Sequence, residues 1–132
     1  MTIDAIAPTV LAVDDSAVMH QMIKRALEPQ YRVLVSDNAV EALSMIYHEP
    51  ISVVLLDVMM PDVDGLEFCR TLRSLPQFQQ LPVVMVTSKD TAFDRVKGKL
   101  AGATEYLIKP FDIDQLRQIV DQLSTASVSE VG

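Results

Sequence analysis

Short apolar segments alternate along the chain with longer segments in which apolar residues recur every three or four positions. Three of the short segments, 10–13, 53–56 and 83–86, are rich in β-branched residues and have no polar position. A strand with one face in water would alternate, so these segments predict strands buried on both faces, as in a parallel sheet covered by helices. Residues 31–35 include a charge and predict an edge strand, and residues 106–108 predict a short fifth strand.

The segments between the strands predict amphipathic helices with well-marked starts. Four of these starts have a polar residue followed three positions later by an acidic or amide side chain, the spacing of a capping box; the polar residues are Asn38, Asp64, Thr91 and Asp112. An apolar stripe follows each start and is expected to face the core. In the fourth helix this stripe consists of Phe93, Val96 and Leu100, and Gly102 is expected to end that helix.

The order of elements predicts an α/β fold made of five strand–helix units. Parallel strands need right-handed crossovers, and three strongly apolar strands belong inside the sheet. These conditions favour a doubly wound five-stranded parallel sheet of order 2-1-3-4-5. We expect an N-terminal extension at residues 1–8, one domain at residues 9–123 and a flexible C-terminal tail at residues 124–132.

Composition narrows the possible functions. The chain of 132 residues is 49% hydrophobic and 22% charged, which is typical of a globular domain. Its net charge is −7 and its basic residues are scattered, so direct nucleic-acid binding is not expected. A single cysteine, Cys69, allows no internal disulfide, and no apolar run approaches the length of a membrane span. We therefore expect a cytoplasmic protein that does not insert into membranes.

Each predicted strand ends in a residue that carries charge or forms hydrogen bonds. In chain order these ends are Asp14-Asp15, Ser36-Asp37, Asp57, Thr87-Ser88 and Lys109-Pro110. The carboxyl ends of parallel strands meet at one edge of the sheet, where ligands bind in open α/β folds. Because the second strand lies at the far side of the sheet, Asp37 is expected to fall outside the resulting cluster.

The predicted cluster brings several carboxylates together, and their mutual repulsion has to be offset by cations. Lys109 supplies one positive charge, and a divalent metal would supply the rest. Carboxylate ligands favour a hard, oxygen-preferring ion, and Mg²⁺ is the best candidate. Such a site suits phosphoryl transfer to a carboxylate, with the hydroxyl of Thr87 and the Lys109 ammonium on the phosphoryl oxygens.

The motifs at the strand ends resemble those of the receiver domains of two-component response regulators, with a flavodoxin/CheY-like fold. The matching segments are LAVDDS, VVLLDVMMPDVDGLE, VVMVTS and EYLIKPF. The resemblance covers residues 9–123 and is closest to the single-domain type, which implies a stand-alone regulator. The segment 95–103 also resembles single-domain regulators of pilus-based motility and chemotaxis-like pathways.

The resemblance implies a role for each residue at the strand ends. Asp57 would be the phosphoacceptor, and Mg²⁺ would be held by Asp14, Asp15, Asp57 and the backbone carbonyl of Met59. Thr87 and Lys109 would hold the phosphoryl oxygens, and the bond between Lys109 and Pro110 would be cis. An apolar Met59 beside the acceptor would also slow hydrolysis of the phosphoryl group.

The resemblance further implies a switch and two kinds of partner. On phosphorylation Thr87 would move toward the phosphate and Tyr106 would turn inward, which would change the surface of the fourth helix, fifth strand and fifth helix. A histidine kinase or phosphotransfer protein would donate the phosphoryl group, and a protein target would bind the changed surface. Receivers often form homodimers through the same elements. Such a domain is not a metabolic enzyme, since it catalyses only its own phosphorylation and dephosphorylation.

Other interpretations stay open from the sequence. Asp14 or Asp15 could simply cap the first helix, and Tyr106 could be a packing residue. The domain could be an interaction module that works without phosphorylation. It could also be a Mg²⁺-dependent phosphatase that forms an aspartyl phosphate, although such enzymes carry a second Asp where this chain has Met59.

Overall fold

A five-stranded parallel sheet forms the centre of the computed structural model, which describes residues 7–131, with side chains up to Ser124. The strand order is β2-β1-β3-β4-β5, as predicted. The strands are β1 (Thr9–Val13), β2 (Arg32–Ser36), β3 (Ile51–Leu56), β4 (Val83–Thr87) and β5 (Glu105–Ile108). β1, β3 and β4 lie inside the sheet, which explains why their sequences are continuously apolar.

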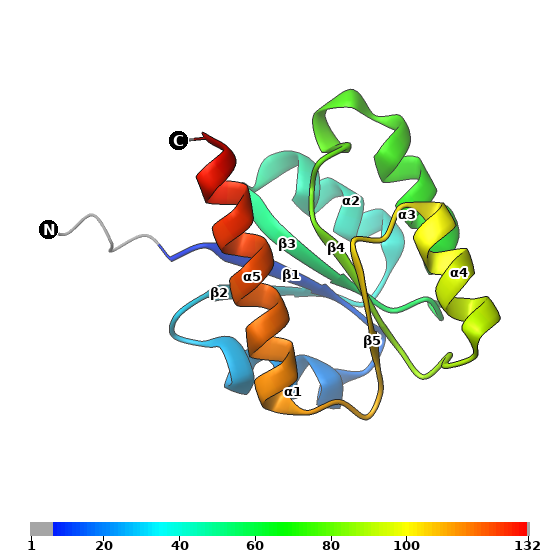
Figure 1. Cartoon of the computed structure of the whole chain (residues 1–132), viewed down its shortest axis with the longest axis horizontal. Coiled ribbons are helices and arrows are strands. Elements are labelled where there is room, and N and C mark those ends of the chain that lie inside the picture. The colour runs from blue at the N-terminus through cyan, green and yellow to red at the C-terminus, as the bar shows by residue number, and fades with distance from the viewer. Residues whose placement is uncertain (1–6, 132) are drawn as a thin grey trace, which may run out of the picture.

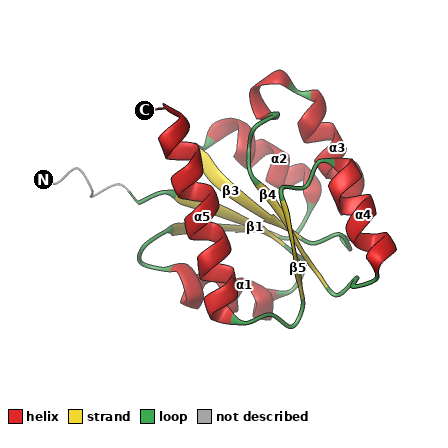
Figure 2. Cartoon of the chain, in the orientation of Figure 1, coloured by secondary structure: helices red, strands yellow, loops and turns green. Residues whose placement is uncertain are grey.

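Five helices connect and follow the strands (Figure 2). They are α1 (Ala17–Leu27), α2 (Ala39–His48), α3 (Gly65–Ser74), α4 (Ala92–Ala101) and α5 (Ile113–Val131), and a 3₁₀ turn spans Pro76–Phe78. Asn38, Asp64 and Thr91 are N-caps, as predicted. Of these three, Thr91 forms both hydrogen bonds of a capping box, and the other two form the side-chain cap. Gly102 ends α4 with a φ of 108°, a left-handed conformation that favours glycine.

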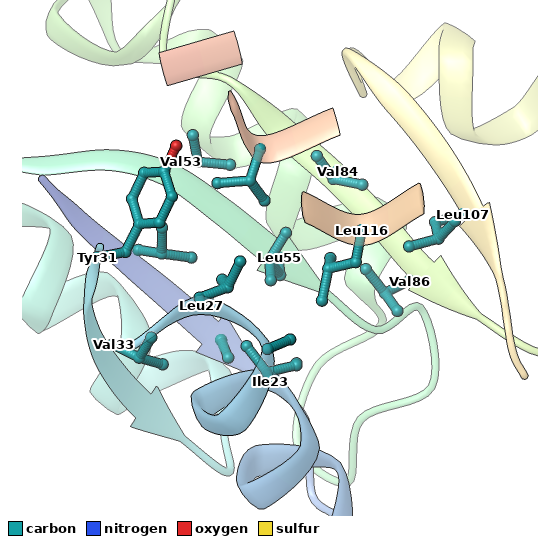
Figure 3. Packing of buried hydrophobic residues seen from close by; sticks show 14 residues of the cluster. Ile23, Leu27, Tyr31, Val33, Val53, Leu55, Val84, Val86, Leu107 and Leu116 are labelled. Atoms are coloured by element: carbon teal, nitrogen blue, oxygen red, sulfur yellow. The ribbon is translucent and has the colours of Figure 1, made fainter. Parts of the chain in front are cut away.

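The helices form a layer on each face of the sheet (Figure 1). α1 and α5 cover one face, and α2, α3 and α4 cover the other. Figure 3 shows the first of these cores, where Ile23 and Leu27 of α1 and Leu116 of α5 pack on Leu55 of β3 and its neighbours. The second core includes Cys69, which is completely buried.

The prediction for the apolar stripe of α4 was wrong. Phe93, Val96 and Leu100 are 71%, 53% and 80% exposed. The helix instead turns its small residues, Gly98 and Ala101, toward the sheet. Helical periodicity is compatible with either the large or the small residues facing the sheet. The small residues allow α4 to lie close to β5 at the edge of the sheet.

Two further features concern the ends of the domain. The backbone of α5 continues to Val131, so a helix occupies most of the segment predicted as a tail. The expected extension at residues 1–8 falls mostly outside the described residues. No helix between residues 7 and 131 is both long and apolar enough to cross a membrane.

Candidate functional site

Parallel pairing places two carboxylates next to each other at one edge of the sheet. Val13 and Leu56 are partners in the register of β1 and β3, and Asp14 and Asp57 are the residues that follow them. The Asp57 amide donates to the Val13 carbonyl at 3.0 Å, which extends the ladder by one position. Asp14 and Asp57 are only 3% and 7% exposed, so their charges need a partner.

Lys109 provides that partner. Its Nζ lies 2.6 Å from Asp14 Oδ2 and 3.1 Å from Asp57 Oδ2. The Lys109 amide donates to the Thr87 carbonyl at 2.9 Å, so pairing of β4 and β5 aims the side chain at the carboxylates. Burial alone would lower the pKa of this ammonium. The hydrogen bonds to Asp14 and Asp57 and the attraction of their negative charges together outweigh burial and raise the pKa above its ordinary value. The bond between Lys109 and Pro110 is cis, as expected.

Asp15 completes a cluster of three carboxylates. One oxygen from each of Asp14, Asp15 and Asp57 lies within 4.8 Å of the others. Carboxylate oxygens at this spacing, from two buried residues and one exposed residue, fit a small divalent cation such as Mg²⁺.

Two nearby acidic and capping positions lie outside the cluster. Asp37 is exposed and accepts a hydrogen bond from Asn38, away from the three carboxylates, as predicted. At the start of α1 the N-cap is Ser16, and Asp14 accepts from the Ser16 amide at 2.9 Å.

Thr87 and Tyr106 both form hydrogen bonds with the backbone of Lys89. The Lys89 amide donates to Thr87 Oγ1 at 3.3 Å, and the Tyr106 hydroxyl donates to the Lys89 carbonyl at 2.8 Å. Thr87 is completely buried at the end of β4, whereas Tyr106 is half-buried on β5. The two side chains predicted to act together are therefore linked through one residue of the β4–α4 loop.

The loop after β3 holds the remaining predicted residue, Met59. Its amide donates to Asp57 Oδ1 at 3.1 Å, which fixes the orientation of that carboxylate. The Met59 side chain is 54% exposed beside the site.

Two residues that shape this loop were not predicted from the sequence. Asp62 accepts from the amides of Ala39 and Val40 at the start of α2, at 3.0 Å and 3.3 Å, and so attaches the loop to that helix. These hydrogen bonds hold the pKa of the Asp62 carboxyl below its ordinary value. A Cβ on Gly65 would lie 2.4 Å from the Asp57 carbonyl oxygen, so only glycine allows α3 to start there. The Asp-Gly pair at 64–65 was visible in the sequence, but nothing pointed to the partners of Asp62.

Comparisons with known proteins agree with this arrangement. The family model for the response regulator receiver domain matches residues 10–121. Response regulator MprA of Mycobacterium leprae is 42% identical over 108 residues, which cover 81% of this chain and 46% of the relative. The chain thus spans about half the length of the curated relatives it matches.

Solved structures support the same assignment. The chemotaxis response regulator CheY4 of Vibrio cholerae is 32% identical, with a TM-score of 0.82 over 89% of this chain and 98% of that one. The Francisella response regulator 1452 receiver domain is also 32% identical, with a TM-score of 0.83 over 91% and 98%. The chain therefore belongs to the receiver domain family of two-component response regulators.

Proposed function

We propose that this receiver accepts a phosphoryl group on Asp57 from the phosphohistidine of a kinase or phosphotransfer protein. The observation that carries the proposal is the buried cluster of Asp14 and Asp57 around Lys109, with Asp15 beside it. A carboxylate oxygen of Asp57 attacks phosphorus, the bond from phosphorus to the histidine nitrogen breaks, and that nitrogen keeps the electron pair. The product is an aspartyl phosphate.

The residues around Asp57 supply binding and charge. Asp14, Asp15, Asp57 and the Met59 carbonyl would hold Mg²⁺. When bound, this ion supplies positive charge that offsets the carboxylates and the phosphoryl oxygens. Lys109 exchanges its hydrogen bond with Asp57 for one with a phosphoryl oxygen, and the Thr87 hydroxyl donates to another.

In the proposed output, phosphorylation shifts the population between two arrangements of the Thr87 and Tyr106 side chains. A Thr87 side chain drawn toward the phosphoryl group leaves space, and the ring of Tyr106 turns into that space. The affected surface comprises α4, β5 and α5. Its α4 part carries the exposed apolar side chains of Phe93, Val96 and Leu100, which suit contact with a protein target.

The identity of the partners is also part of the proposal. The likeness of segment 95–103 to motility regulators, and the structural likeness to a chemotaxis response regulator, favour a target in motility or chemotaxis-type signalling. A cytoplasmic location and a role as signalling module rather than metabolic enzyme fit this function.

Intact-mass spectrometry with acetyl phosphate and Mg²⁺ tests the proposal. We expect the chain to gain the mass of one phosphoryl group, and to lose this gain in the Asp57→Asn variant and in EDTA. If the wild type gains no mass from acetyl phosphate or from a panel of phosphorylated histidine kinases, the interaction module that needs no phosphorylation becomes the better explanation. Rapid hydrolysis of an added phosphate monoester, such as p-nitrophenyl phosphate, would instead favour the phosphatase.

A further inference from the structure

Asp62 joins the loop that follows the acceptor to the start of α2. The Ala39 amide donates to its Oδ1 at 3.1 Å and to its Oδ2 at 3.0 Å, and the Val40 amide donates to Oδ2 at 3.3 Å. The Val63 amide donates to Oδ1 at 2.9 Å, so the same carboxylate also fixes the loop backbone next to it. Both carboxylate oxygens are therefore used, and they connect segments 23 residues apart in sequence.

The start of α2 is well suited to hold this carboxylate. The Asn38 side chain accepts from the Glu41 amide at 2.8 Å, and the Ala42 amide donates to the Asn38 carbonyl at 3.2 Å. Asp62 takes the amides of the two positions between them, which the geometry of a helix leaves without an internal partner. Its negative charge lies at the positive end of the helix dipole. Because α2 is itself packed in the second core, the loop is attached to a fixed element.

Asp62 holds the middle of a loop whose two ends are held by other contacts. At the first end the Asp57 amide donates to the Val13 carbonyl at 3.0 Å, and at the other the Gly65 amide donates to the Val58 carbonyl at 2.8 Å. Within the described part of the chain, the hydrogen bonds that tie residues 59–63 to another helix or strand are those of Asp62. The Met59 carbonyl, which the proposed function makes a ligand of Mg²⁺, lies in this segment.

We propose that Asp62 is a positioning residue for the metal site, which holds the Met59 carbonyl in place by attaching the loop to α2. Mg²⁺ demands nearly ideal octahedral geometry, so a carbonyl that is free to move is a poor ligand for it. A ligand that is already held in place also loses less freedom when the ion binds. The inference rests on the proposed function and deepens it, because it names a residue outside the ligand set that sets the affinity for the ion.

Isothermal titration calorimetry with MgCl₂, without a phosphodonor, measures this affinity directly. Asp62→Ala should raise the Kd for Mg²⁺ about tenfold, the effect typical of losing a residue that orients a metal ligand. Asp62→Asn keeps one oxygen that can accept from the α2 amides, so its Kd should lie between those of the wild type and Asp62→Ala. An unchanged Kd in Asp62→Ala would overturn the proposal.

The matched control for charge is Asp37→Ala. This substitution also removes a carboxylate from the edge of the sheet that holds the site, but Asp37 is exposed and accepts from the neighbouring Asn38 side chain rather than from α2. Screening by salt should limit its effect on the Kd to less than about twofold. Equal effects of Asp37→Ala and Asp62→Ala would show that only negative charge matters, and would contradict a positioning role.

Amide hydrogen exchange measured by NMR without Mg²⁺ tests the position of the loop itself. Asp62→Ala should speed exchange at Ala39 and Val40, which lose their acceptor, and at Met59, whose amide donates to Asp57 Oδ1 at 3.1 Å. The Asp94 amide, which Thr91 holds at the start of α4, should exchange at the wild-type rate. Unchanged exchange at Met59 would overturn the proposal, because the loop would then keep its shape without Asp62.

The rate of phosphorylation by acetyl phosphate at increasing Mg²⁺ concentrations separates the two kinds of failure. Asp62→Ala should need more Mg²⁺ for its half-maximal rate and should reach nearly the wild-type maximum. If the wild type neither binds Mg²⁺ nor gains a phosphoryl group, the proposed function fails and the metal role of Asp62 fails with it. If the wild type does both and Asp62→Ala has the same Mg²⁺ requirement, the proposed function stands and the inference about Asp62 is wrong.

Discussion

The ammonium of Lys109 donates a hydrogen bond to the carboxylate of Asp57 at 3.1 Å across 52 residues of sequence. No local interaction brings these groups together. Each follows the end of a parallel strand, and the order of strands in the sheet places both ends at the same edge. The site is therefore a consequence of the topology, and changes to it can be predicted from the geometry.

Replacing Lys109 with Met should destabilise the protein and make it depend on a divalent cation. Without the ammonium, two largely buried carboxylates face each other unpaired, which should cost about 2–3 kcal/mol of unfolding free energy. Because a cation binds only the folded cluster, Mg²⁺ should recover more stability in this variant than in the wild type. Urea unfolding with and without Mg²⁺ measures both effects.

The matched control is Lys99→Met, which removes an exposed ammonium from α4. It should change stability by less than about 0.5 kcal/mol. Equal effects of the two substitutions would argue against the ion pairs seen at Lys109.

Replacing Gly65 with Ala should disturb the acceptor itself. The added Cβ would lie 2.4 Å from the Asp57 carbonyl oxygen and 2.7 Å from Val58 Cα, and backbone atoms cannot rotate away. We expect a loss of about 2 kcal/mol or more in unfolding free energy. The rate of phosphorylation by acetyl phosphate should also fall, because Asp57 is displaced. Thr71→Ala, at an exposed position of the same helix, is the control and should leave the rate unchanged.

The free energy of unfolding should fall at high pH because the hydroxyl of Tyr31 loses its proton. Burial, together with its 2.5 Å hydrogen bond to Asp121, raises the pKa of Tyr31 from 10.0 to about 12. A pKa raised by folding gives stability that is complete below the unfolded value and lost as the pH rises toward the folded one. The stability difference between the wild type and Tyr31→Phe should therefore shrink between pH 10 and 12. Urea unfolding of both proteins checks this, and a difference that stays constant with pH would refute the assignment.

Replacing Met59 with Asn should shorten the life of the phosphoryl group. The Met59 side chain is 54% exposed, two residues after Asp57. We expect it to place apolar surface in the path of an attacking water. An amide in its place can bind that water, so hydrolysis should become faster. The decay of the phosphorylated mass, followed over time, gives the rate. Val63→Asn, which adds an amide to the same loop farther from the acceptor, should have no effect.

Most of the fold could be predicted because the sequence patterns that mark its strands and helix starts are local. The continuous apolar sequences of β1, β3 and β4 marked inner strands, and the spacing at Thr91 marked the start of α4. The site followed from the same information, since each strand end is adjacent in sequence to a recognisable apolar run.

The features that could not be predicted depend on contacts between distant segments. Helical periodicity alone could not decide which side of α4 faces the sheet, and the larger stripe of Phe93, Val96 and Leu100 is the exposed one. The hydrogen bonds of Asp62 to the start of α2 have no sequence pattern of their own. The close packing of Gly98 on Tyr106 likewise depends on how near α4 lies to β5.

The most direct test of the central claim is to identify the residue that carries the phosphoryl group. After reaction with acetyl phosphate and Mg²⁺, borohydride reduces an aspartyl phosphate to homoserine, and tandem mass spectrometry of the digested protein locates the change. We predict homoserine at position 57 and at no other acidic residue. Modification at Asp14, Asp15 or Asp37 in place of Asp57 would contradict the assignment of the acceptor.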